Sequence, residues 1–277
     1  MLPDQYNNTL EYLKSLDNIT RHATLIDPEE QSPEEATKII QIAIEAGTDL
    51  ILIGGSTTNK KCVEETVETI QEVMELQQWA ATQNGVFENQ KTSVPVILFP
   101  NASSTLSKNA DALLFMSLLN SNSTKYLVDE QLKATEYIFE NNIETIPTGY
   151  IIFEPGMKVG EVGEANLIKN NDINTTKAWS RLAKYFNFEI LYLEAGSGSP
   201  IPISSEIIST SKKEFDGLLF VGGGIKTTDQ AKEIANAGAD WIVTGNFIEI
   251  NLDYKSLKIK LEELIDEIKS PTKEPPQ

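Results

Sequence analysis

Short apolar runs alternate with amphipathic segments along most of the chain, and this alternation restricts the folds that it can adopt. The apolar runs are almost uninterrupted by polar residues, as strands buried on both faces of a parallel sheet are. They lie at Ala23–Ile26, Leu50–Ile53, Val94–Phe99, Ala112–Phe115, Gly149–Phe153, Glu189–Leu193, Gly217–Val221 and Trp241–Val243. Helical patterns between and after them are predicted at Pro33–Ala46, Lys60–Thr82, Lys125–Glu140, Thr175–Tyr185, Pro202–Ser211, Thr227–Ala237 and Ser256–Ile268. Repeated β-then-α units in this number predict an α/β fold of the (β/α)8 barrel type.

One crossover of this barrel is abnormal. The segment PNASSTLSKNAD, between Phe99 and Ala112, is too short and too polar for a full crossover helix. We therefore expect helix three of the barrel to be missing or replaced by an extended segment. A missing helix would leave an apolar gap in the outer ring, where a long ligand could bind.

The chain reads as a single barrel domain over residues 1–277. An internal echo supports this, because EAGTDLILIGG (Glu45–Gly55) resembles NAGADWIVTGN (Asn236–Asn246), as expected for repeated βα units. Residues 1–20 are predicted to hold an N-terminal helix, and residues 269–277 a flexible tail.

The composition excludes several functional classes. The formal net charge of −18 argues against nucleic acid and against a polybasic anchor on anionic lipid. No run approaches the roughly 20 apolar residues that span a bilayer, and the N-terminus lacks a hydrophobic signal core. Cys62 is the only cysteine, which favours a reducing compartment. We expect a cytoplasmic protein with no stable membrane anchor.

Three strand ends carry glycine or other small residues. They are LYLEAGSG at Leu191–Gly198, FVGGGI at Phe220–Ile225 and VTGN at Val243–Asn246. Glycine lets backbone N–H groups approach an anion, and a following helix N-terminus adds positive potential. The carboxyl ends of barrel strands share one face, so these segments predict a phosphate-binding cup.

Other strand ends offer side chains for chemistry. Asp27 follows the first strand, and Ser56 follows two glycines after the second, so both could contact Mg²⁺ or a diphosphate. Turn and helix-capping roles are the alternatives for both. Glu194 shares a strand face with Tyr192 and could accept a proton from a substrate hydroxyl, unless it forms a structural ion pair. His22, the only histidine, is interpreted as structural, so any metal should have oxygen ligands.

Motifs across the chain resemble those of one family. HATLIDPEE, DLILIGGST, VPVILFP, ADALLFMSLLNS, IPTGYII, LYLEAGSGSPIP, FVGGGI and GADWIVTGN occur in this order. Together they resemble the geranylgeranylglyceryl phosphate synthase family, including its bacterial PcrB-type relatives. The resemblance implies a modified TIM barrel lacking helix three, and Mg²⁺-dependent transfer of a prenyl group from a prenyl diphosphate to the C3 hydroxyl of sn-glycerol 1-phosphate. Diphosphate is released, and the product belongs to ether-lipid biosynthesis.

The resemblance also implies roles for individual residues. Asp27 and Ser56 would hold Mg²⁺ and the diphosphate, and Glu194 would take the proton or stabilise a carbocation, with Tyr192 as the second catalytic candidate. Glycerol phosphate would be held by Tyr192, Leu193, Glu194, Ala195, Gly196, Ser197, Gly198, Gly223, Gly224, Gly245 and Asn246. Phe99, Tyr126 and Trp179 are candidates for lining a prenyl groove, with ordinary packing as the alternative. A homo-oligomer is expected.

The length of the prenyl group stays open. The AGSG sequence resembles the geranylgeranyl branch of the family more than the heptaprenyl branch, which favours geranylgeranyl diphosphate. Asn101, however, stands where the family pattern leads us to expect glycine, in the segment next to the expected groove. A proline expected near Asn170 is also absent.

Two other readings stay open at this stage. One is a phosphate-binding barrel that isomerises or cleaves sugar or indole phosphates. It would need a catalytic lysine or a carboxylate pair at the strand ends, and neither is clearly placed. The other is a barrel that binds a phosphate ligand without catalysis, although Asp27, Ser56 and Glu194 are all present.

Overall fold

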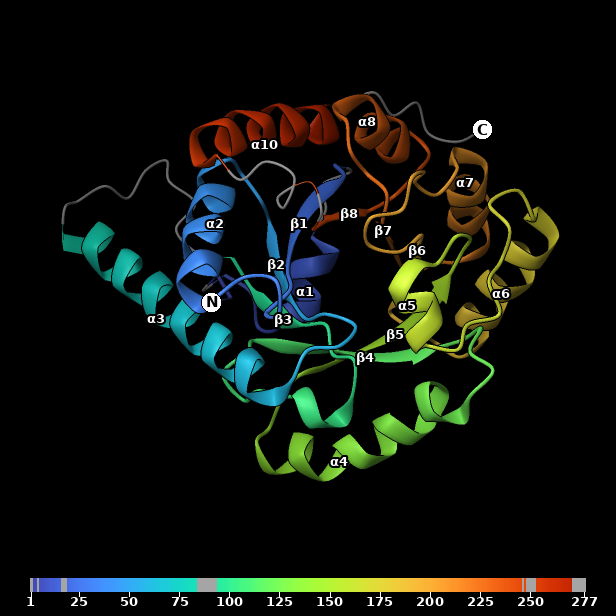
Figure 1. The fold of residues 1–277 in the computed structure, drawn as a ribbon, viewed down its shortest axis with the longest axis horizontal. Coiled ribbons are helices and arrows are strands. Elements are labelled where there is room, and N and C mark those ends of the chain that lie inside the picture. The colour runs from blue at the N-terminus through green and yellow to red at the C-terminus, as the bar shows by residue number, and fades with distance from the viewer. Residues whose placement is uncertain are drawn as a thin grey trace.

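The eight strands form one closed parallel barrel. A computed structural model describes residues 2–3, 5–15, 19–83, 94–245, 247 and 253–270, and Figure 1 shows the barrel with its helices around it. The strands pair in chain order, and β8 closes onto β1. They are β1 (Arg21–Ile26), β2 (Leu50–Ile53), β3 (Val96–Leu98), β4 (Ala112–Leu118), β5 (Thr145–Ile152), β6 (Ile190–Glu194), β7 (Leu218–Gly222) and β8 (Trp241–Thr244). The predicted barrel is confirmed.

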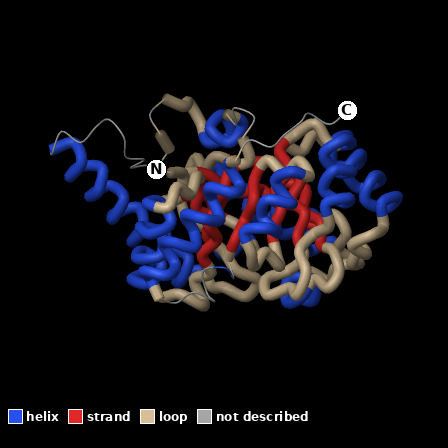
Figure 2. Tube along the Cα trace, turned by 90° about the horizontal axis from the view of Figure 1, so that it is seen from above, coloured by secondary structure: helices blue, strands red, loops and turns tan. Residues whose placement is uncertain are grey.

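Helices surround the strands on the outside, as the view from above shows (Figure 2). They are α2 (Pro33–Glu45), α3 (Lys60–Gln83), α4 (Glu130–Glu140), α5 (Met157–Val162), α6 (Ile173–Tyr185), α7 (Ser205–Glu214), α8 (Thr228–Asn236) and α10 (Tyr254–Lys269). A π-helical turn, η2 (Lys125–Asp129), leads into α4. Within the described ranges, no helix has both the length and the apolar character needed to cross a bilayer.

Local sequence explains where several of these helices begin. Ser32 and Glu35 form a reciprocal capping box at the start of α2, and Thr227 and Gln230 form another at the start of α8. Each box satisfies backbone N–H groups that have no partner inside the helix. The short helix α5 was not predicted, because its segment MKVGEV contains glycine and follows a Pro-Gly pair.

The crossover from β3 to β4 contains no α-helix, as predicted. Only one 3₁₀ turn, η1 (Ser103–Thr105), interrupts an otherwise irregular path. The backbone N–H and the hydroxyl of Ser103 both donate to the Glu130 carboxylate, at 2.8 and 2.7 Å. The Asn101 side-chain amide donates to the Thr58 carbonyl. The crossover is therefore fastened to α4 on one side and to the loop before α3 on the other.

A short helix, α1 (Thr9–Lys14), covers the amino-terminal end of the barrel. The Trp241 indole N–H donates to the Leu13 carbonyl, and the buried Tyr12 hydroxyl donates to the Asp49 carbonyl. The Tyr12 and Trp241 rings lie 6.4 Å apart. The opposite end, where the strands finish, is left for the site. Most of the predicted C-terminal tail, residues 271–277, lies outside the described residues.

His22 lies near this closed end, on the face of β1 that points toward the surrounding helices. Its ring is fully buried, and its two nitrogens lie 2.9 Å from the hydroxyls of Thr48 and Thr244. These partners follow α2 and end β8, so the ring joins β1 to both of its neighbours. This arrangement matches the structural role expected for the single histidine.

Replacing His22 should therefore weaken the fold. His22→Leu keeps an apolar volume but leaves the buried hydroxyls of Thr48 and Thr244 without this partner, so we expect a loss of about 1–3 kcal/mol in the free energy of unfolding. Thermal unfolding measures this as a fall of several degrees in Tm. Lys61→Leu, at a side chain 81% exposed on α3, is the control and should change Tm little. An unchanged Tm in His22→Leu would contradict the structural role.

Candidate active site

The loops after β6 and β7 pack tightly against each other at the open end of the barrel. Gly196 and Gly223 have φ values of +95° and +84°, in the left-handed region that favours glycine. A Cβ on Gly223 would lie 2.3 Å from the Glu194 carboxylate and 2.7 Å from the Gly196 nitrogen. Glycine is thus required here by both backbone conformation and space.

Gly222 belongs to the same arrangement, although the sequence reasoning did not single it out. A Cβ at this position would lie 2.5 Å from the Tyr192 hydroxyl and 3.0 Å from the Glu194 carboxylate. The register of the barrel explains this, because Gly222 pairs with Glu194 across β6 and β7. The run of three glycines in FVGGGI was the available signal, but only the register shows which glycine faces which side chain.

Glu194 is buried, with 5% of its surface exposed. The Gly196 N–H donates to its Oε1 at 2.7 Å. Burial raises the pKa of the carboxyl to about 7, while the Gly196 and Ala195 N–H groups and the nearby Tyr192 hydroxyl act in the opposite direction. Glu194 makes no ion pair with any residue in the described part of the chain. Glu194 therefore does not form the structural ion pair that was the alternative to a catalytic role. With a pKa of about 7, the carboxyl can exchange a proton near neutral pH.

Tyr192 lies beside this carboxyl on the same strand face. Its side chain is fully buried, and its hydroxyl makes no well-formed hydrogen bond with a described residue. Burial and the neighbouring Glu194 charge raise the pKa of the Tyr192 hydroxyl well above its usual range. Tyr192 therefore stays protonated at neutral pH, and its hydroxyl is available as a hydrogen-bond donor.

Some backbone N–H groups of the cup are bonded within the protein, and others are left for a ligand. The Gly196 N–H, expected to face a phosphate, is instead used by Glu194, and the Ala195 N–H donates to the Gly222 carbonyl at 3.2 Å. The N–H groups of Gly223 and Gly224 make no hydrogen bond within the described part of the chain. These two amides are the better candidates for an anion.

The remaining predicted cup residues lie around these glycines. A Cβ on Gly198 would meet no atom within 4 Å, so this glycine borders open space, whereas Gly245 lies against Leu25 of β1. Leu193 and Ala195 are buried, and Ser197 is exposed. Asn246 lies outside the described residues.

Asp27, after β1, lies against Gly55, the residue before Ser56 at the end of β2. A Cβ on Gly55 would lie 2.1 Å from the Asp27 carboxylate, so this carboxylate packs directly on the chain that carries Ser56. Asp27 also accepts the Glu29 N–H at 3.0 Å, which is the turn role weighed as its alternative. No group of three or more His, Cys, Asp or Glu side chains suited to a metal occurs within the described ranges. One carboxylate and one hydroxyl suit Mg²⁺ only if substrate phosphates and water complete its oxygen ligands.

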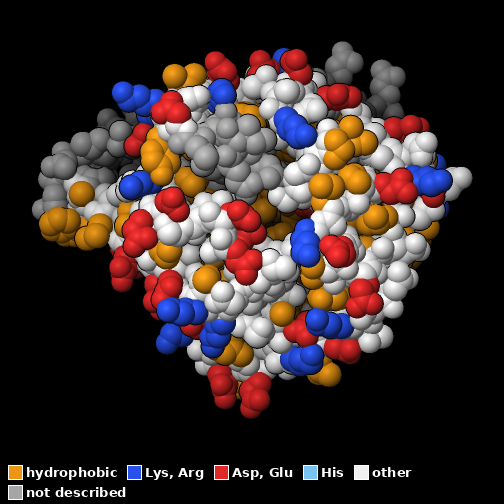
Figure 3. Space-filling model, in the orientation of Figure 1, with side chains coloured by type: hydrophobic (Ala, Val, Ile, Leu, Met, Phe, Trp, Pro, Cys, Tyr) orange, Lys and Arg blue, Asp and Glu red, His pale blue; other side chains and the backbone are white. Residues whose placement is uncertain are grey.

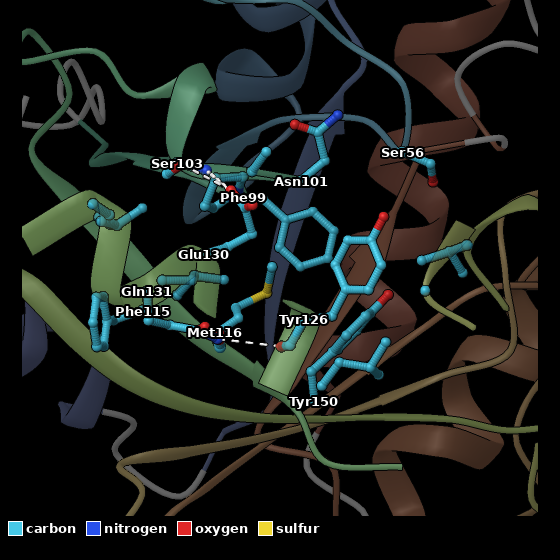
Figure 4. A pocket seen from close by; sticks show the side chains of 18 of the residues that line it. Ser56, Phe99, Asn101, Ser103, Phe115, Met116, Tyr126, Glu130, Gln131 and Tyr150 are labelled. Carbon is cyan, nitrogen blue, oxygen red and sulfur yellow. Dashed lines mark hydrogen bonds between the residues drawn. The ribbon is translucent and has the colours of Figure 1, made fainter. Parts of the chain in front are cut away.

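An apolar cavity runs from Ser56 along the inner side of the crossover that lacks a helix. It encloses about 820 Å³ of empty space, counting its open mouth. Its walls come from β4 residues 113–116 and 118, crossover residues 99–103 and 106, and α4 with the turn before it. Figure 4 shows Phe99, Tyr126 and Tyr150 in the middle of this cavity. In Figure 3, apolar side chains are visible inside a hollow near the centre of the face.

The structure places the three predicted groove residues differently. Phe99 and Tyr126 line the cavity, but Trp179 does not; it is half-buried on α6 and packs against the main hydrophobic core. Tyr150, which the sequence reasoning did not name, lines the cavity from the inner face of β5. Burial and the nearby Glu194 charge raise the pKa of the Tyr150 hydroxyl well above its usual range.

Comparison with known proteins gives strong matches over nearly the whole chain. Residues 17–268 match the PcrB family. A geranylgeranylglyceryl phosphate synthase from Thermoplasma volcanium is 41% identical over 261 residues, covering 94% of this chain and 95% of the relative. A relative of the same name from Picrophilus torridus is 39% identical and covers 95% of this chain and 99% of its own length.

Solved structures agree with these matches. The crystal structure of (S)-3-O-geranylgeranylglyceryl phosphate synthase from Thermoplasma acidophilum, in complex with its substrate sn-glycerol-1-phosphate, superimposes with a TM-score of 0.84 at 38% identity. The alignment covers 95% of this chain and 99% of that one. Tryptophan synthase from Mycobacterium tuberculosis, at 12% identity and a TM-score of 0.56 over 96% of this chain and 100% of that one, shares the barrel fold alone. With the family match spanning both the barrel and the strand-end loops, the chain belongs to the PcrB and geranylgeranylglyceryl phosphate synthase family.

Proposed function

We propose that the protein transfers a prenyl group from a prenyl diphosphate to the C3 hydroxyl of sn-glycerol 1-phosphate. The product is an ether, and diphosphate is the leaving group. The observation that carries the proposal is the buried Glu194 carboxyl, which packs against Gly222 and Gly223 of the glycine cup. Its neighbour Tyr192 contacts Phe99 and Tyr150, two residues that line the apolar cavity. Relatives at about 40% identity bear the name geranylgeranylglyceryl phosphate synthase, so we take the geranylgeranyl group as the donor and ether-lipid biosynthesis as the setting.

The glycerol phosphate would bind at the glycine cup. The N–H groups of Gly223 and Gly224, which bond to no described residue, offer two donors to a phosphate, and α8 begins shortly after them, at Thr228. The relative from Thermoplasma acidophilum was crystallised with sn-glycerol-1-phosphate, which supports the same ligand for this cup.

The donor would bind with its diphosphate near Ser56 and its tail in the apolar cavity. Asp27 and Ser56 would hold a Mg²⁺ ion there, and the ion would neutralise charge on the departing diphosphate. The fit rests on the oxygen donors of these two residues and on the close packing of Gly55 against Asp27. Among the described residues that line the cavity, Glu130 is the one with a carboxylate, and it is held by Ser103 and Lys133.

In the reaction, the electron pair of the C1–O bond leaves with the diphosphate. The C3 hydroxyl oxygen of the glycerol phosphate forms the new bond to C1, and its proton passes to Glu194. A pKa of about 7 lets this carboxyl accept a proton at neutral pH without being protonated throughout. The Tyr192 hydroxyl, next to the carboxyl, would orient it.

The described residues give less support to the alternative of an isomerase or aldolase. Among the described residues that line the cavity, none is a lysine. The other two buried carboxylates in the described ranges, Asp49 and Asp240, form ion pairs with Lys269 and Lys212. Among the described residues, Glu194 is thus the one buried carboxylate that makes no ion pair.

We also propose that the protein is a cytoplasmic homo-oligomer. The support for self-association is the outer face of α4, where Leu132 and Phe139 are 69% and 87% exposed. Contact of this face with a second copy of the chain would remove both apolar side chains from water.

The role of Glu194 predicts a selective loss of turnover. Glu194→Gln keeps the shape of the side chain and an acceptor for the Gly196 N–H, but it cannot take a proton. We expect kcat to fall about 10²- to 10⁴-fold, with little change in the KM for glycerol phosphate. Wild-type kcat/KM should rise with pH through about 7, because the deprotonated carboxylate is the active form.

The pH profile of Glu194→Gln serves as one control, since it should retain only the titration of the substrate phosphate. Glu189→Gln serves as the other. Glu189 lies just before β6, at the opposite end of the strand, where it pairs with Lys14, and its replacement should leave kcat nearly unchanged. A large rise in KM with kcat intact would make Glu194 a binding residue and leave the proton acceptor unidentified.

If Asp27 holds Mg²⁺, removing its negative charge should abolish prenyl transfer. Asp27→Asn keeps an oxygen that can accept the Glu29 N–H but removes the negative charge. Prenyl transfer should be lost at ordinary Mg²⁺ concentrations, while calorimetry still detects binding of glycerol phosphate. Glu30→Gln, an exposed neighbour, is the matched control and should retain activity. Activity of Asp27→Asn within a few-fold of wild type would exclude Asp27 as a metal ligand.

A further inference from the structure

We propose that Phe99 and Tyr150 form an aromatic corner that stabilises the allylic carbocation formed as the donor loses its diphosphate. This inference rests on the proposed prenyl transfer and assigns a catalytic contact to two ring faces. Glu194 supplies the proton acceptor, but positive charge develops on the prenyl group before the new bond is complete. The structure offers aromatic rings at that point.

The two rings meet at nearly a right angle. Their centroids are 5.7 Å apart and their planes differ by 87°. Tyr192 supports both from behind: it stacks on Phe99 at 5.3 Å and meets Tyr150 edge-on at 5.2 Å. Tyr192 is fully buried, whereas Phe99 and Tyr150 line the cavity. The corner is therefore held in place by packing before any ligand binds.

The corner lies where the reacting carbon has to be. The Phe99 carbonyl packs directly against Gly54, where a Cβ would lie 1.8 Å from it, so this ring adjoins the Gly55–Ser56 end of the cavity. The apolar end of the cavity lies beyond it, along β4 and Ala134. A donor with its diphosphate at Ser56 and its tail along β4 places C1 beside Phe99 and Tyr150 (Figure 4). The Glu194 carboxylate and the Tyr192 hydroxyl both lie against Gly222, so the proton acceptor is next to the ring that contacts the corner.

An aromatic ring face is a better neighbour for an allylic cation than a carboxylate is. The face of an aromatic ring carries negative potential that attracts a cation, more strongly when water is excluded. A carboxylate touching C1 could capture the cation as an ester, whereas a ring face stabilises it without forming that bond. The one acidic side chain in the cavity wall, Glu130, is held by Ser103 and Lys133.

Kinetics of ring variants form the first part of the test. Tyr150→Phe keeps the ring and removes the hydroxyl, so its rate of prenyl transfer in a single turnover should stay near that of wild type. Tyr150→Leu and Phe99→Leu keep an apolar side chain but remove the ring, and each should slow that step about 3- to 30-fold. KM for the donor should change little, because the charge exists only near the transition state.

Binding of a charged and a neutral ligand separates this role from packing. Geranylgeranylammonium carries a cation next to C1, and geranylgeraniol has the same tail without charge; each is titrated in the presence of inorganic diphosphate and Mg²⁺. Tyr150→Leu should weaken binding of the ammonium about 3- to 30-fold relative to wild type, while binding of the alcohol changes much less. Phe99→Leu should behave in the same way and provides a second, independent variant.

The outcomes distinguish a failure of the aromatic corner from a failure of the proposed prenyl transfer. The cation-stabilising role of the corner would be refuted if the variants lost equal affinity for the ammonium and the alcohol. It would also be refuted if Tyr150→Phe slowed prenyl transfer as much as Tyr150→Leu. Wild-type protein that forms no ether product would refute the proposed function itself. Active wild-type protein with variants of unchanged rate would refute only the inference about the rings.

Discussion

The site depends on one constraint: the Glu194 carboxyl is buried, and no described residue forms an ion pair with it. Placing Glu194 at the end of β6 costs solvation free energy, because a charged carboxylate is stabilised by water. The protein offsets part of this cost with the Gly196 N–H and the nearby Tyr192 hydroxyl rather than with lysine or arginine. That choice keeps the pKa near 7 instead of lowering it. It also explains the glycines, because a Cβ at Gly222 or Gly223 would occupy the space of the carboxyl and its neighbours.

The absence of a helix between β3 and β4 leaves the apolar cavity, which is the second part of the site. A regular helix between β3 and β4 would pack its side chains against the apolar residues of β4, as the other helices do on neighbouring strands. The irregular path from Phe99 to Asp111 leaves that space as a cavity, and the bonds from Ser103 to Glu130 keep the path in place. Barrel closure then brings the cavity, the metal-binding candidates and the glycine cup to one end of the molecule.

The sequence predicted the barrel because each buried strand is a nearly continuous apolar run, and it predicted the missing helix because PNASSTLSKNAD is too short for one. It could name Glu194 and the glycines, since strand ends and small residues are visible in one dimension. It could not show that Glu194 itself uses the Gly196 N–H, because a turn of two residues decides that. Nor could it find Tyr150 or exclude Trp179 from this cavity, since both depend on which side of an apolar or amphipathic element faces the gap.

The most direct test of the account is product formation with each mirror form of the acceptor. Purified protein would be incubated with geranylgeranyl diphosphate, Mg²⁺ and either sn-glycerol 1-phosphate or sn-glycerol 3-phosphate, and the products identified by mass spectrometry. The account predicts a geranylgeranyl ether and free diphosphate with the sn-glycerol 1-phosphate form, and at most a trace with its mirror image. Equal product from both forms, or none from either while both ligands bind, would contradict it.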